Sequence, residues 1–435
     1  MTTAPAIDHI TPLEWKNTAV FEARVPGSKS YTNRALVLAA QRLGRTDVTG
    51  ALHCDDTRYL ASCLDSFGGL SVEQTDDGFR VERSIDTLGA PDSELFAGAA
   101  GTPARFLLSF ASGASGTSIV TGNERLCERP MSHLLDALTE AGVRCEPLAR
   151  PGCLPVRVHG GPPANRTWKI NGDVSSQFVS SLILLAAQQK EGPIEVRVPG
   201  HLVSRPYVEM TLRMLRDNGI TASEPDANRF VIEPAVPTCD VIPVEVDASG
   251  MSYFLVAAAI TGTRVRIPGI AADSAQGDVG LAFALERMGC SLDFDDSGLE
   301  LGGGPLRGID IDMETMPDTV LSLAIAAAVA EGETRITNIA NLRVKECDRI
   351  HAAATELGRV GIDVEEGEDF LVIRPGGTLQ PATVRTYDDH RVAMSFGLLR
   401  LLRDGIEIED PACVAKSFPD FWTELARFKE HHAGG

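Results

Sequence analysis

Lysine and arginine residues recur in short polar loops of this 435-residue sequence, and each loop runs into a segment rich in Ala, Leu and Val. A polar loop before an apolar run is typical of a helix start, where unpaired N–H groups and the helix dipole attract anions. An arginine there can bind a carboxylate or a phosphate with two parallel hydrogen bonds. The spacing therefore predicts a site for small anions. Its basic residues are Lys29, Arg34, Arg105, Lys345, Arg349 and Arg391, with Arg129 and Lys416 in neighbouring segments.

The polar loops and the apolar runs that follow them recur about 70 to 75 residues apart, which indicates an internal repeat. A helix made from such a run has no polar face and must be buried all round. Three such helices in each half of the chain would form a parallel bundle with their N-termini at one end. The six loops begin at Gly27, Gly101, Asp173, Asp247, Pro317 and Asp388.

A second class of helix recurs in step with the first and carries apolar residues at i, i+3, i+4 and i+7, so one stripe is buried. Short alternating runs between the helices are typical of strands. The sequence thus predicts an α/β fold of two domains with three copies of one unit each, although two unrelated three-layer domains would also fit. The boundary is expected near 241–246, with a first crossover near 24–27. The amphipathic helices begin at Asp56, Met131, Tyr207, Asp278 and Asp348, and a truncated copy begins at Phe421.

Composition excludes several classes of protein. The formal net charge of −20 disfavours nucleic acid and anionic membranes as partners. The apolar runs are shorter than the roughly 20 residues of a membrane span, and the N-terminal residues lack the features of a secretion signal. Nine cysteines without a Cys-x-x-Cys pair indicate reduced thiols, and no His/Cys/Asp cluster has metal-site spacing. We expect a cytoplasmic protein without a metal or cofactor.

Some residues in these loops also have a plain structural interpretation. Ser175–Gln177 could be a helix cap, and Asp318 could be a first-turn acid favoured by the dipole. Asp388 and Asp389 are expected to be first-turn acids of this kind. His390 alone would more often be a packing residue than a catalyst. The recurrence of basic residues at equivalent places in the repeat favours a site over a set of surface charges.

Eight short motifs occur in order between Val25 and Trp422. They are PGSKSYTNRALVLAA at Pro26, AGTPAR at Ala100, ERP at Glu128, GDVSSQF at Gly172, LVSRPY at Leu202, NLRVKECDRI at Asn341, YDDHRVAMSF at Tyr387 and DPACVAKSFPDFW at Asp410. One of them could arise by chance. Together they resemble the 5-enolpyruvylshikimate-3-phosphate synthase family over nearly the whole chain.

The resemblance implies a pair of inside-out α/β barrels, each made of three βαββαβ repeats with buried parallel helices. It implies that residues 1–25 and 246–435 form domain I and residues 26–245 form domain II, with the active site in the interdomain cleft. The implied reaction belongs to the shikimate pathway. It transfers the enolpyruvyl (1-carboxyvinyl) group of phosphoenolpyruvate to the 5-hydroxyl of shikimate 3-phosphate by addition and then elimination of phosphate. We expect a monomer.

The family's residue roles carry over motif by motif. Asp318 is expected to take the 5-hydroxyl proton, Glu346 to protonate the methylene carbon, and Lys29 to protonate the departing phosphate. The residues implied for shikimate 3-phosphate are Lys29, Ser30, Arg34, Ser175, Ser176, Gln177, Ser204, Tyr207, Asp318, Asn341 and Lys345. Those implied for phosphoenolpyruvate are Lys29, Gly101, Arg129, Gln177, Arg349, Arg391 and Lys416. The role of His390 is left open.

The loop that contains Arg105 departs from the family's usual Asn-Ala-Gly-Thr-Ala-Met-Arg-Pro. Ala99 lacks the amide that would line the phosphoenolpyruvate pocket, and Phe106 replaces a proline that shapes the helix. Gly101 is retained, so the backbone can still approach a substrate closely. The affinity for phosphoenolpyruvate and the response to glyphosate, the family's competitive inhibitor, are therefore open.

Two other functions stay in view. UDP-N-acetylglucosamine enolpyruvyl transferase shares the fold and the donor. It usually carries Lys-Asn where this chain has Lys29-Ser30, and a reactive Cys where this chain has Glu124. A non-catalytic anion-binding protein on the same scaffold would have little reason to keep Asp318 and Glu346 among so many cations.

Overall fold

The computed structural model describes residues 19–433, so the predictions for the segment before Ala19 lie outside the described residues. The chain divides into two compact units. Unit 2 is Pro26–Glu245, and unit 1 consists of the segments that precede and follow it. Each unit has its own sheets and its own buried helices.

Unit 2 contains three four-stranded sheets of one design. In each sheet a short strand pairs in parallel with the strand after a buried helix, and an antiparallel hairpin completes the sheet. The first sheet takes its parallel strand from the far end of the unit. The sheets are β13 (Val241–Pro243)-β2 (Gly44–Thr49)-β4 (Gly78–Arg83)-β3 (Leu70–Thr75), β5 (Leu95–Phe96)-β6 (Thr117–Thr121)-β8 (Val156–His159)-β7 (Cys145–Pro147), and β9 (Thr167–Lys169)-β10 (Ile194–Arg197)-β12 (Arg229–Ile232)-β11 (Ala222–Asp226).

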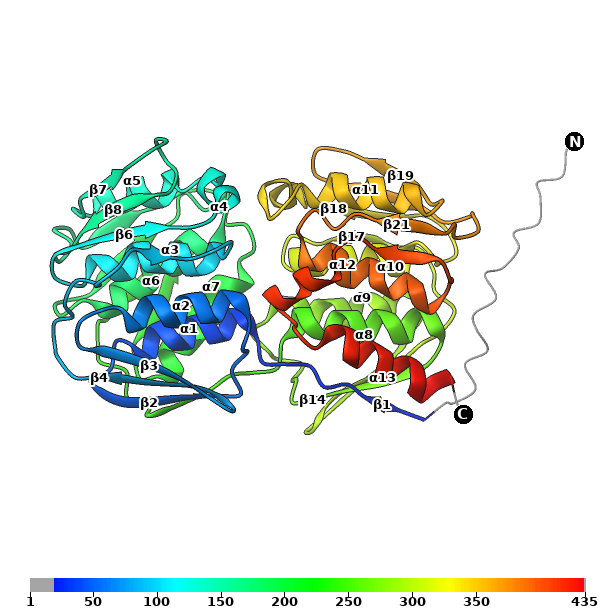
Figure 1. The fold of residues 1–435 in the computed structure, drawn as a ribbon, viewed down its shortest axis with the longest axis horizontal. Coiled ribbons are helices and arrows are strands. Elements are labelled where there is room, and N and C mark those ends of the chain that lie inside the picture. The colour runs from blue at the N-terminus through cyan, green and yellow to red at the C-terminus, as the bar shows by residue number, and fades with distance from the viewer. Residues whose placement is uncertain (1–18, 434–435) are drawn as a thin grey trace, which may run out of the picture. The chain divides into compact units, whose positions relative to one another are not determined.

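Three apolar helices form the interior of unit 2, between β2–β4 on one side and β6–β8 on another (Figure 1). Arg105 and Ser109 of one helix bond to Gln177 and Ser181 of the next. Both partners advance by four residues, so these two helices run parallel, as predicted. The buried helices are α1 (Lys29–Ala39), α3 (Gly101–Ser112) and α6 (Ser176–Gln188); the others are α2 (Asp55–Asp65), α4 (Glu124–Glu128), α5 (Ser132–Glu140) and α7 (Pro206–Asp217).

Unit 1 repeats this design twice and then shortens it. Its third sheet has only two parallel strands, because the hairpin is missing and a helix follows instead. This shortened repeat matches the truncated copy that the sequence predicts. The sheets are β1 (Phe21–Glu22)-β14 (Arg264–Pro268)-β16 (Gly298–Gly302)-β15 (Ser291–Asp295), β17 (Asp310–Asp312)-β18 (Thr334–Thr337)-β20 (Leu371–Arg374)-β19 (Asp363–Glu366), and β21 (Ala382–Val384)-β22 (Ile406–Ile408).

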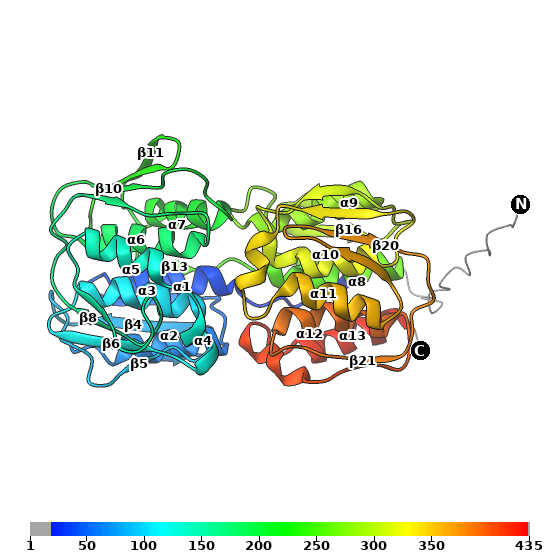
Figure 2. The same ribbon diagram turned by 90° about the horizontal axis from the view of Figure 1, so that it is seen from above.

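The buried helices of unit 1 lie between its sheets, and every residue of the longest, α8, is buried (Figure 2). The hydroxyls of Ser252 in α8 and Ser322 in α10 are 2.9 Å apart, which brings the first turns of these helices together. The buried helices are α8 (Ala248–Thr261), α10 (Val320–Ala327) and α12 (His390–Gly397), and the others are α9 (Gly280–Met288), α11 (Arg349–Arg359) and α13 (Phe421–Ala433). Short 3-10 segments are η1 (Gly277–Val279), η2 (Pro317–Thr319), η3 (Ala340–Val344), η4 (Leu398–Leu401) and η5 (Pro411–Lys416).

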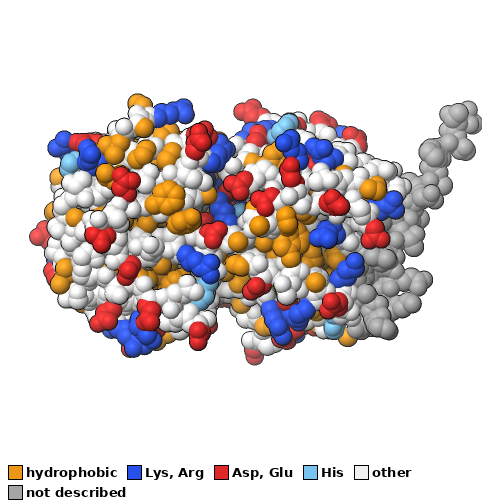
Figure 3. All heavy atoms as spheres, viewed as in Figure 1, with side chains coloured by type: hydrophobic (Ala, Val, Ile, Leu, Met, Phe, Trp, Pro, Cys, Tyr) orange, Lys and Arg blue, Asp and Glu red, His pale blue; other side chains and the backbone are white. Residues whose placement is uncertain are grey.

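The repeated sheets around buried helices confirm the predicted inside-out α/β fold. On the face shown in Figure 3, acidic and basic side chains are interspersed over the surface of each unit. In the described part of the chain, no helix is both long and apolar enough to cross a membrane. The nine cysteines are free thiols. Burial raises the pKa of Cys54 and of Cys290 to about 11, which makes these thiols poor nucleophiles.

Candidate active site

Lys29 is the first residue of α1 and pairs with Asp56 in the first turn of α2. Its Nζ lies 3.2 Å from Asp56 Oδ2, and the two side chains are only 14% and 5% exposed. Ser28 caps the helix by accepting a hydrogen bond from the N–H of Tyr31. The cap and the ion pair hold the ammonium group at the N-terminal end of a buried helix, where the helix dipole also attracts anions.

Arg34 points into the interior of unit 2 and is 1% exposed. Its guanidinium group donates four hydrogen bonds of 2.8 to 3.2 Å. The acceptors are the hydroxyls of Thr211 and Ser180 and the backbone carbonyls of Ser30 and Tyr207. Burial lowers the pKa of Arg34 to about 10, because the charged form is desolvated. Arg34 therefore ties α1 to α6 and α7 through neutral partners.

The start of α3 brings two guanidinium groups together. A Cβ atom at Gly101 would lie 2.8 Å from Nη1 of Arg129 and 3.1 Å from Nη1 of Arg105. Arg105 donates to the Gln177 amide oxygen and lies 5.0 Å from the ring centroid of Phe178. Gly101 thus leaves room for two cations beside a helix N-terminus. Gly101, Arg129 and Gln177, which are expected to bind phosphoenolpyruvate, lie around Arg105. In the sequence Arg105 is identified as a basic residue of the loop, with no role in binding assigned to it.

The serines expected to bind shikimate 3-phosphate lie at the starts of α6 and α7. Ser175 caps α6, with its hydroxyl accepting from the N–H of Gln177 at 3.3 Å, and Ser176 is the first helical residue. Ser204 is buried just before α7 and has a φ of 51°, which is uncommon for a serine. Tyr207 is the second residue of that helix. Helix starts of this kind offer backbone N–H groups to an anion.

Arg349 is the centre of an ionic network at the start of α11, and its side chain is 2% exposed. Nε donates to Asp389 at 2.8 Å, Nη1 to Asp318 at 3.1 Å, and Nη2 to Glu346 at 3.0 Å. Burial alone would lower the pKa of Arg349, but the three carboxylates together raise it above its ordinary value. Two carboxylates from separate loops are therefore fixed on the two terminal nitrogens of one planar group.

Two further cations extend this network. Nη2 of Arg391 donates to Oδ2 of Asp318 at 2.8 Å, and Nζ of Lys416 donates to Oε1 of Glu346 at 3.0 Å. Asp318 and Glu346 are each bound by two cations and are 19% and 14% exposed. The network offers carboxylates that can accept protons and cations that can stabilise developing negative charge.

The other candidates of unit 1 lie close by in the sequence but make different contacts. Asn341 belongs to η3, and Lys345 directly precedes Glu346; both are partly buried. His390 is the first residue of α12 and is 1% exposed, with Nδ1 3.8 Å from Oδ1 of Asp389. That separation is longer than a hydrogen bond. The burial of His390 favours a packing role.

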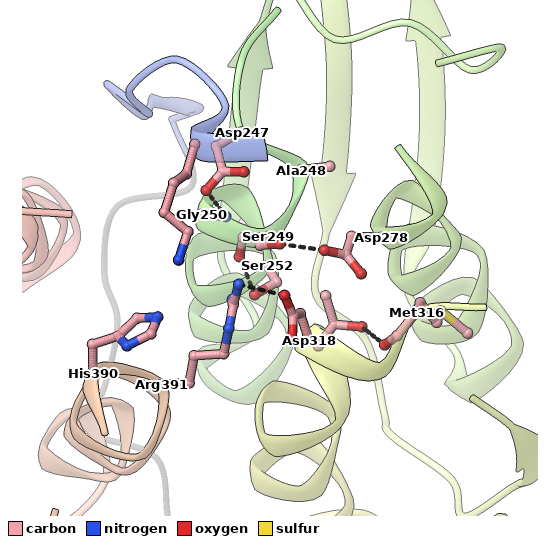
Figure 4. A network of polar contacts seen from close by, with 12 residues as sticks. Asp247, Ala248, Ser249, Gly250, Ser252, Asp278, Met316, Asp318, His390 and Arg391 are labelled. Atoms are coloured by element: carbon pink, nitrogen blue, oxygen red, sulfur yellow. Dashed lines mark hydrogen bonds and ion pairs between the residues drawn. The ribbon is translucent and has the colours of Figure 1, made fainter. Parts of the chain in front are cut away.

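Two acidic residues have larger roles than the sequence suggests. The expectation that Asp389 is only a first-turn acid is too narrow, because its carboxylate both caps α12 and binds Arg349. Asp278, which begins a predicted amphipathic helix, is buried and accepts a hydrogen bond from the Ser249 hydroxyl (Figure 4). Burial and the charge of Asp318 raise the pKa of Asp278 to about 7. An acid at a helix start resembles an ordinary cap, so only its burial distinguishes it.

Comparison with known proteins agrees with the fold. The profile of the EPSP synthase (3-phosphoshikimate 1-carboxyvinyltransferase) family matches residues 18–425. The 3-phosphoshikimate 1-carboxyvinyltransferase of Sulfurovum sp. (strain NBC37-1) is 40% identical over 411 residues, 93% of this chain and 95% of the relative. That of Serratia proteamaculans (strain 568) is 41% identical over 413 residues, with the same shares of 93% and 95%. The solved EPSP synthase of Acinetobacter baumannii has a TM-score of 0.79 and 28% identity, and the match covers 94% of this chain and 96% of that one.

Proposed function

The chain belongs to the EPSP synthase (3-phosphoshikimate 1-carboxyvinyltransferase) family, and we propose that the cation clusters of units 1 and 2 carry out the family's reaction. The enzyme is a transferase of the shikimate pathway that uses phosphoenolpyruvate. We propose further that unit 1 and unit 2 are the two domains expected from the sequence, and that residues of both act on the same pair of substrates.

The reaction joins the 5-hydroxyl oxygen of shikimate 3-phosphate to C2 of phosphoenolpyruvate and releases phosphate. In the addition stage a base takes the hydroxyl proton while an acid protonates the methylene carbon. In the elimination stage phosphate leaves, and the new methyl carbon gives back a proton. The chemistry therefore needs a base, an acid that also acts as a base, and cations for a phosphate and a carboxylate.

The observation that carries this proposal is the attachment of Asp318 and Glu346 to one guanidinium group, that of Arg349. A shared planar partner fixes the orientation of both carboxylates, as a base and an acid acting on two neighbouring atoms require. We assign Asp318 as the base and Glu346 as the acid. Because two cationic donors favour the ionised form of Glu346, it takes up a proton from solvent before it acts as the acid.

We assign substrate binding to the residues at the helix starts. Arg34 donates to the neutral hydroxyls of Thr211 and Ser180, and these contacts orient its guanidinium group without cancelling its charge. The proposed ligands of shikimate 3-phosphate are Lys29, Ser30, Arg34, Ser175, Ser176, Gln177, Ser204, Tyr207, Asp318, Asn341 and Lys345. Those of phosphoenolpyruvate are Lys29, Gly101, Arg129, Gln177, Arg349, Arg391 and Lys416, and Lys29 would protonate the leaving phosphate.

We infer that the enzyme acts in the cytoplasm as a monomer. The free thiols suit a reducing compartment. Sedimentation of the purified protein at the mass of two chains would contradict the monomer.

Phosphate release from phosphoenolpyruvate tests the function. We expect release with shikimate 3-phosphate and none with UDP-N-acetylglucosamine. Release with the UDP-sugar alone would overturn the assignment of the acceptor.

The same assay tests the residues. Asp318→Asn and Glu346→Gln should each lower kcat by about 10²- to 10⁴-fold, the usual contribution of a general acid or base, while the KM values change much less. Glu286→Gln, on the exposed face of α9, is the matched control and should keep the parental rate. Parental turnover by either active-site variant would refute its role.

A further inference from the structure

The proposed base, Asp318, is bound in a way that weakens it. Oδ1 accepts a hydrogen bond from Arg349 and Oδ2 accepts one from Arg391, at 3.1 and 2.8 Å. Cationic donors stabilise a carboxylate more than a carboxylic acid, so they lower its proton affinity. A base at this position would be strengthened by a negative charge close to it.

Asp278 supplies a second carboxyl group beside Asp318. The two residues belong to η1 and η2, which pack against each other. Figure 4 shows both side chains in one network with Ser249 and Arg391, and the charges of Asp278 and Asp318 interact. Asp278 is only 4% exposed, so the protein dominates its environment.

The groups around Asp278 oppose a second negative charge. Those that face it are Asp318 of η2, Arg391 of α12 and Asp247, the N-cap of α8. The cation Arg391 already donates to Asp318 and to the hydroxyl of Tyr253. The hydroxyl of Ser249 donates to Asp278 and is the contact that favours the ionised form. Asp278 therefore keeps its proton more readily than an ordinary carboxyl group while Asp318 is ionised.

We propose that Asp278 is a positioning residue whose negative charge strengthens Asp318 as the base of the reaction. The inference rests on the assignment of Asp318 under the proposed function. Below neutral pH Asp278 carries a proton, and Asp318 is held between two arginines, which lower its proton affinity. As the pH rises Asp278 loses this proton to solvent, and the second charge increases the proton affinity of Asp318. The 5-hydroxyl O–H bond then breaks, the proton joins Asp318, and it leaves to solvent before the next turnover.

The pH dependence of kcat tests this inference. In the parental enzyme kcat should rise with pH near neutrality. Asp278→Asn removes the charge but keeps the shape, so this rise should be lost and kcat on the alkaline side should fall about tenfold, with KM nearly unchanged. Ser249→Ala keeps the carboxyl group and removes its donor, so the rise should move to higher pH. Asp293→Asn, an exposed acid of β15, is the control and should leave the profile unchanged.

The stability of the same variants separates this role from a structural one. An unfolded chain ionises Asp278 at the ordinary carboxyl pKa, whereas the folded chain does so only near pH 7. The folded state therefore loses stability as pH rises between these values, and Asp278→Asn should unfold at a higher denaturant concentration than the parent at neutral pH but not in acid.

An Asp278→Asn variant that keeps the parental pH rise, or that is destabilised at neutral pH, would overturn the inference. An active Asp318→Asn variant would instead remove the base assignment on which it rests, so the two failures are distinguishable.

Discussion

The buried arginines of the two units have different hydrogen-bond partners, although Lys29 of unit 2 also pairs with a carboxylate, that of Asp56. In unit 2 Arg34 donates to hydroxyls and backbone carbonyls, and Arg105 donates to the amide oxygen of Gln177. In unit 1 Arg349, Arg391 and Lys416 donate to carboxylates. Neutral partners orient a cation without cancelling its charge, whereas carboxylate partners cancel the charge and are themselves fixed in place. One repeated scaffold thus presents Arg34 with neutral acceptors in unit 2 and Arg349 with carboxylate acceptors in unit 1.

The difference comes from a few residues at the helix starts. In unit 2 α3 begins at Gly101, and the loop before α6 contains Asp173 and the cap Ser175. In unit 1 the corresponding loops before α10 and α12 contain Asp318 and Asp389. Asp318 and Asp389 accept hydrogen bonds from Arg349, whereas Ser175 caps its own helix.

Substitution of the central arginine of each unit should reveal the largest difference between the units, measured as the loss in free energy of unfolding. Arg349→Met leaves three carboxylates without their shared partner, and we expect it to lower the free energy of unfolding of unit 1 by about 3–5 kcal/mol. Arg34→Met leaves only neutral acceptors unpaired, and we expect unit 2 to lose about 1–3 kcal/mol. Hydrogen exchange of peptides from each unit measures the two effects separately.

The loss of stability in the two arginine variants should also depend differently on pH. Protonation of the carboxylates removes the unpaired charge, so the deficit of Arg349→Met should shrink as the pH falls, while that of Arg34→Met should not change. Arg374→Met, which breaks exposed ion pairs with Glu333 and Glu365, is the control and should change stability by less than about 1 kcal/mol. Equal deficits with equal pH dependence in the two units would refute the distinction between their cations.

Gln177→Glu should give Arg105 of unit 2 a carboxylate partner, as Arg349 of unit 1 has. The new carboxylate would accept from Arg105 where the amide oxygen does now and would cancel its charge. We expect binding of the anionic substrates to weaken about tenfold or more, because the added carboxylate repels an anionic ligand and neutralises Arg105. Isothermal titration with shikimate 3-phosphate and the KM for phosphoenolpyruvate measure the change.

Gln188→Glu, at the other end of the same helix, is the matched control, since it adds the same charge far along α6 from the cluster. Unchanged substrate binding in Gln177→Glu would mean that the charge of Arg105 is not available to ligands.

The sequence predicts most of the fold because the buried helices, the amphipathic helices and the strands recur along the chain as copies of one unit. The apolar runs, the amphipathic helices and the shortened last copy at Phe421 all reappear as elements of the structure. The partners of the cations could not be predicted, because they depend on side chains brought together from separate copies. Nothing local indicates that Arg34 reaches Thr211, or that Asp389 binds Arg349 as well as capping its own helix.

The burial of Asp278 could not be predicted from the sequence pattern either. Its position at the start of an apolar-striped helix is typical of a solvent-exposed cap, and the pattern does not reveal that η1 packs against η2. Burial of the carboxyl group is a tertiary property, and with it comes the raised pKa.

Phe106→Leu should give the smallest effect and shows which substrate the unusual loop influences. The sequence raises a doubt about phosphoenolpyruvate, but the buried Phe106 ring lies 5.4 Å from the Arg34 guanidinium carbon. Leucine keeps the apolar volume and loses the cation–π contact, so we expect unit 2 to lose about 0.5–2 kcal/mol. The KM for shikimate 3-phosphate should rise slightly, while the KM for phosphoenolpyruvate and inhibition by glyphosate stay unchanged.

Phe110→Leu, one turn along α3 against Phe67, loses similar packing without touching Arg34 and should leave both KM values unchanged. A change in the KM for phosphoenolpyruvate in Phe106→Leu alone would instead connect this position to the Gly101 cluster.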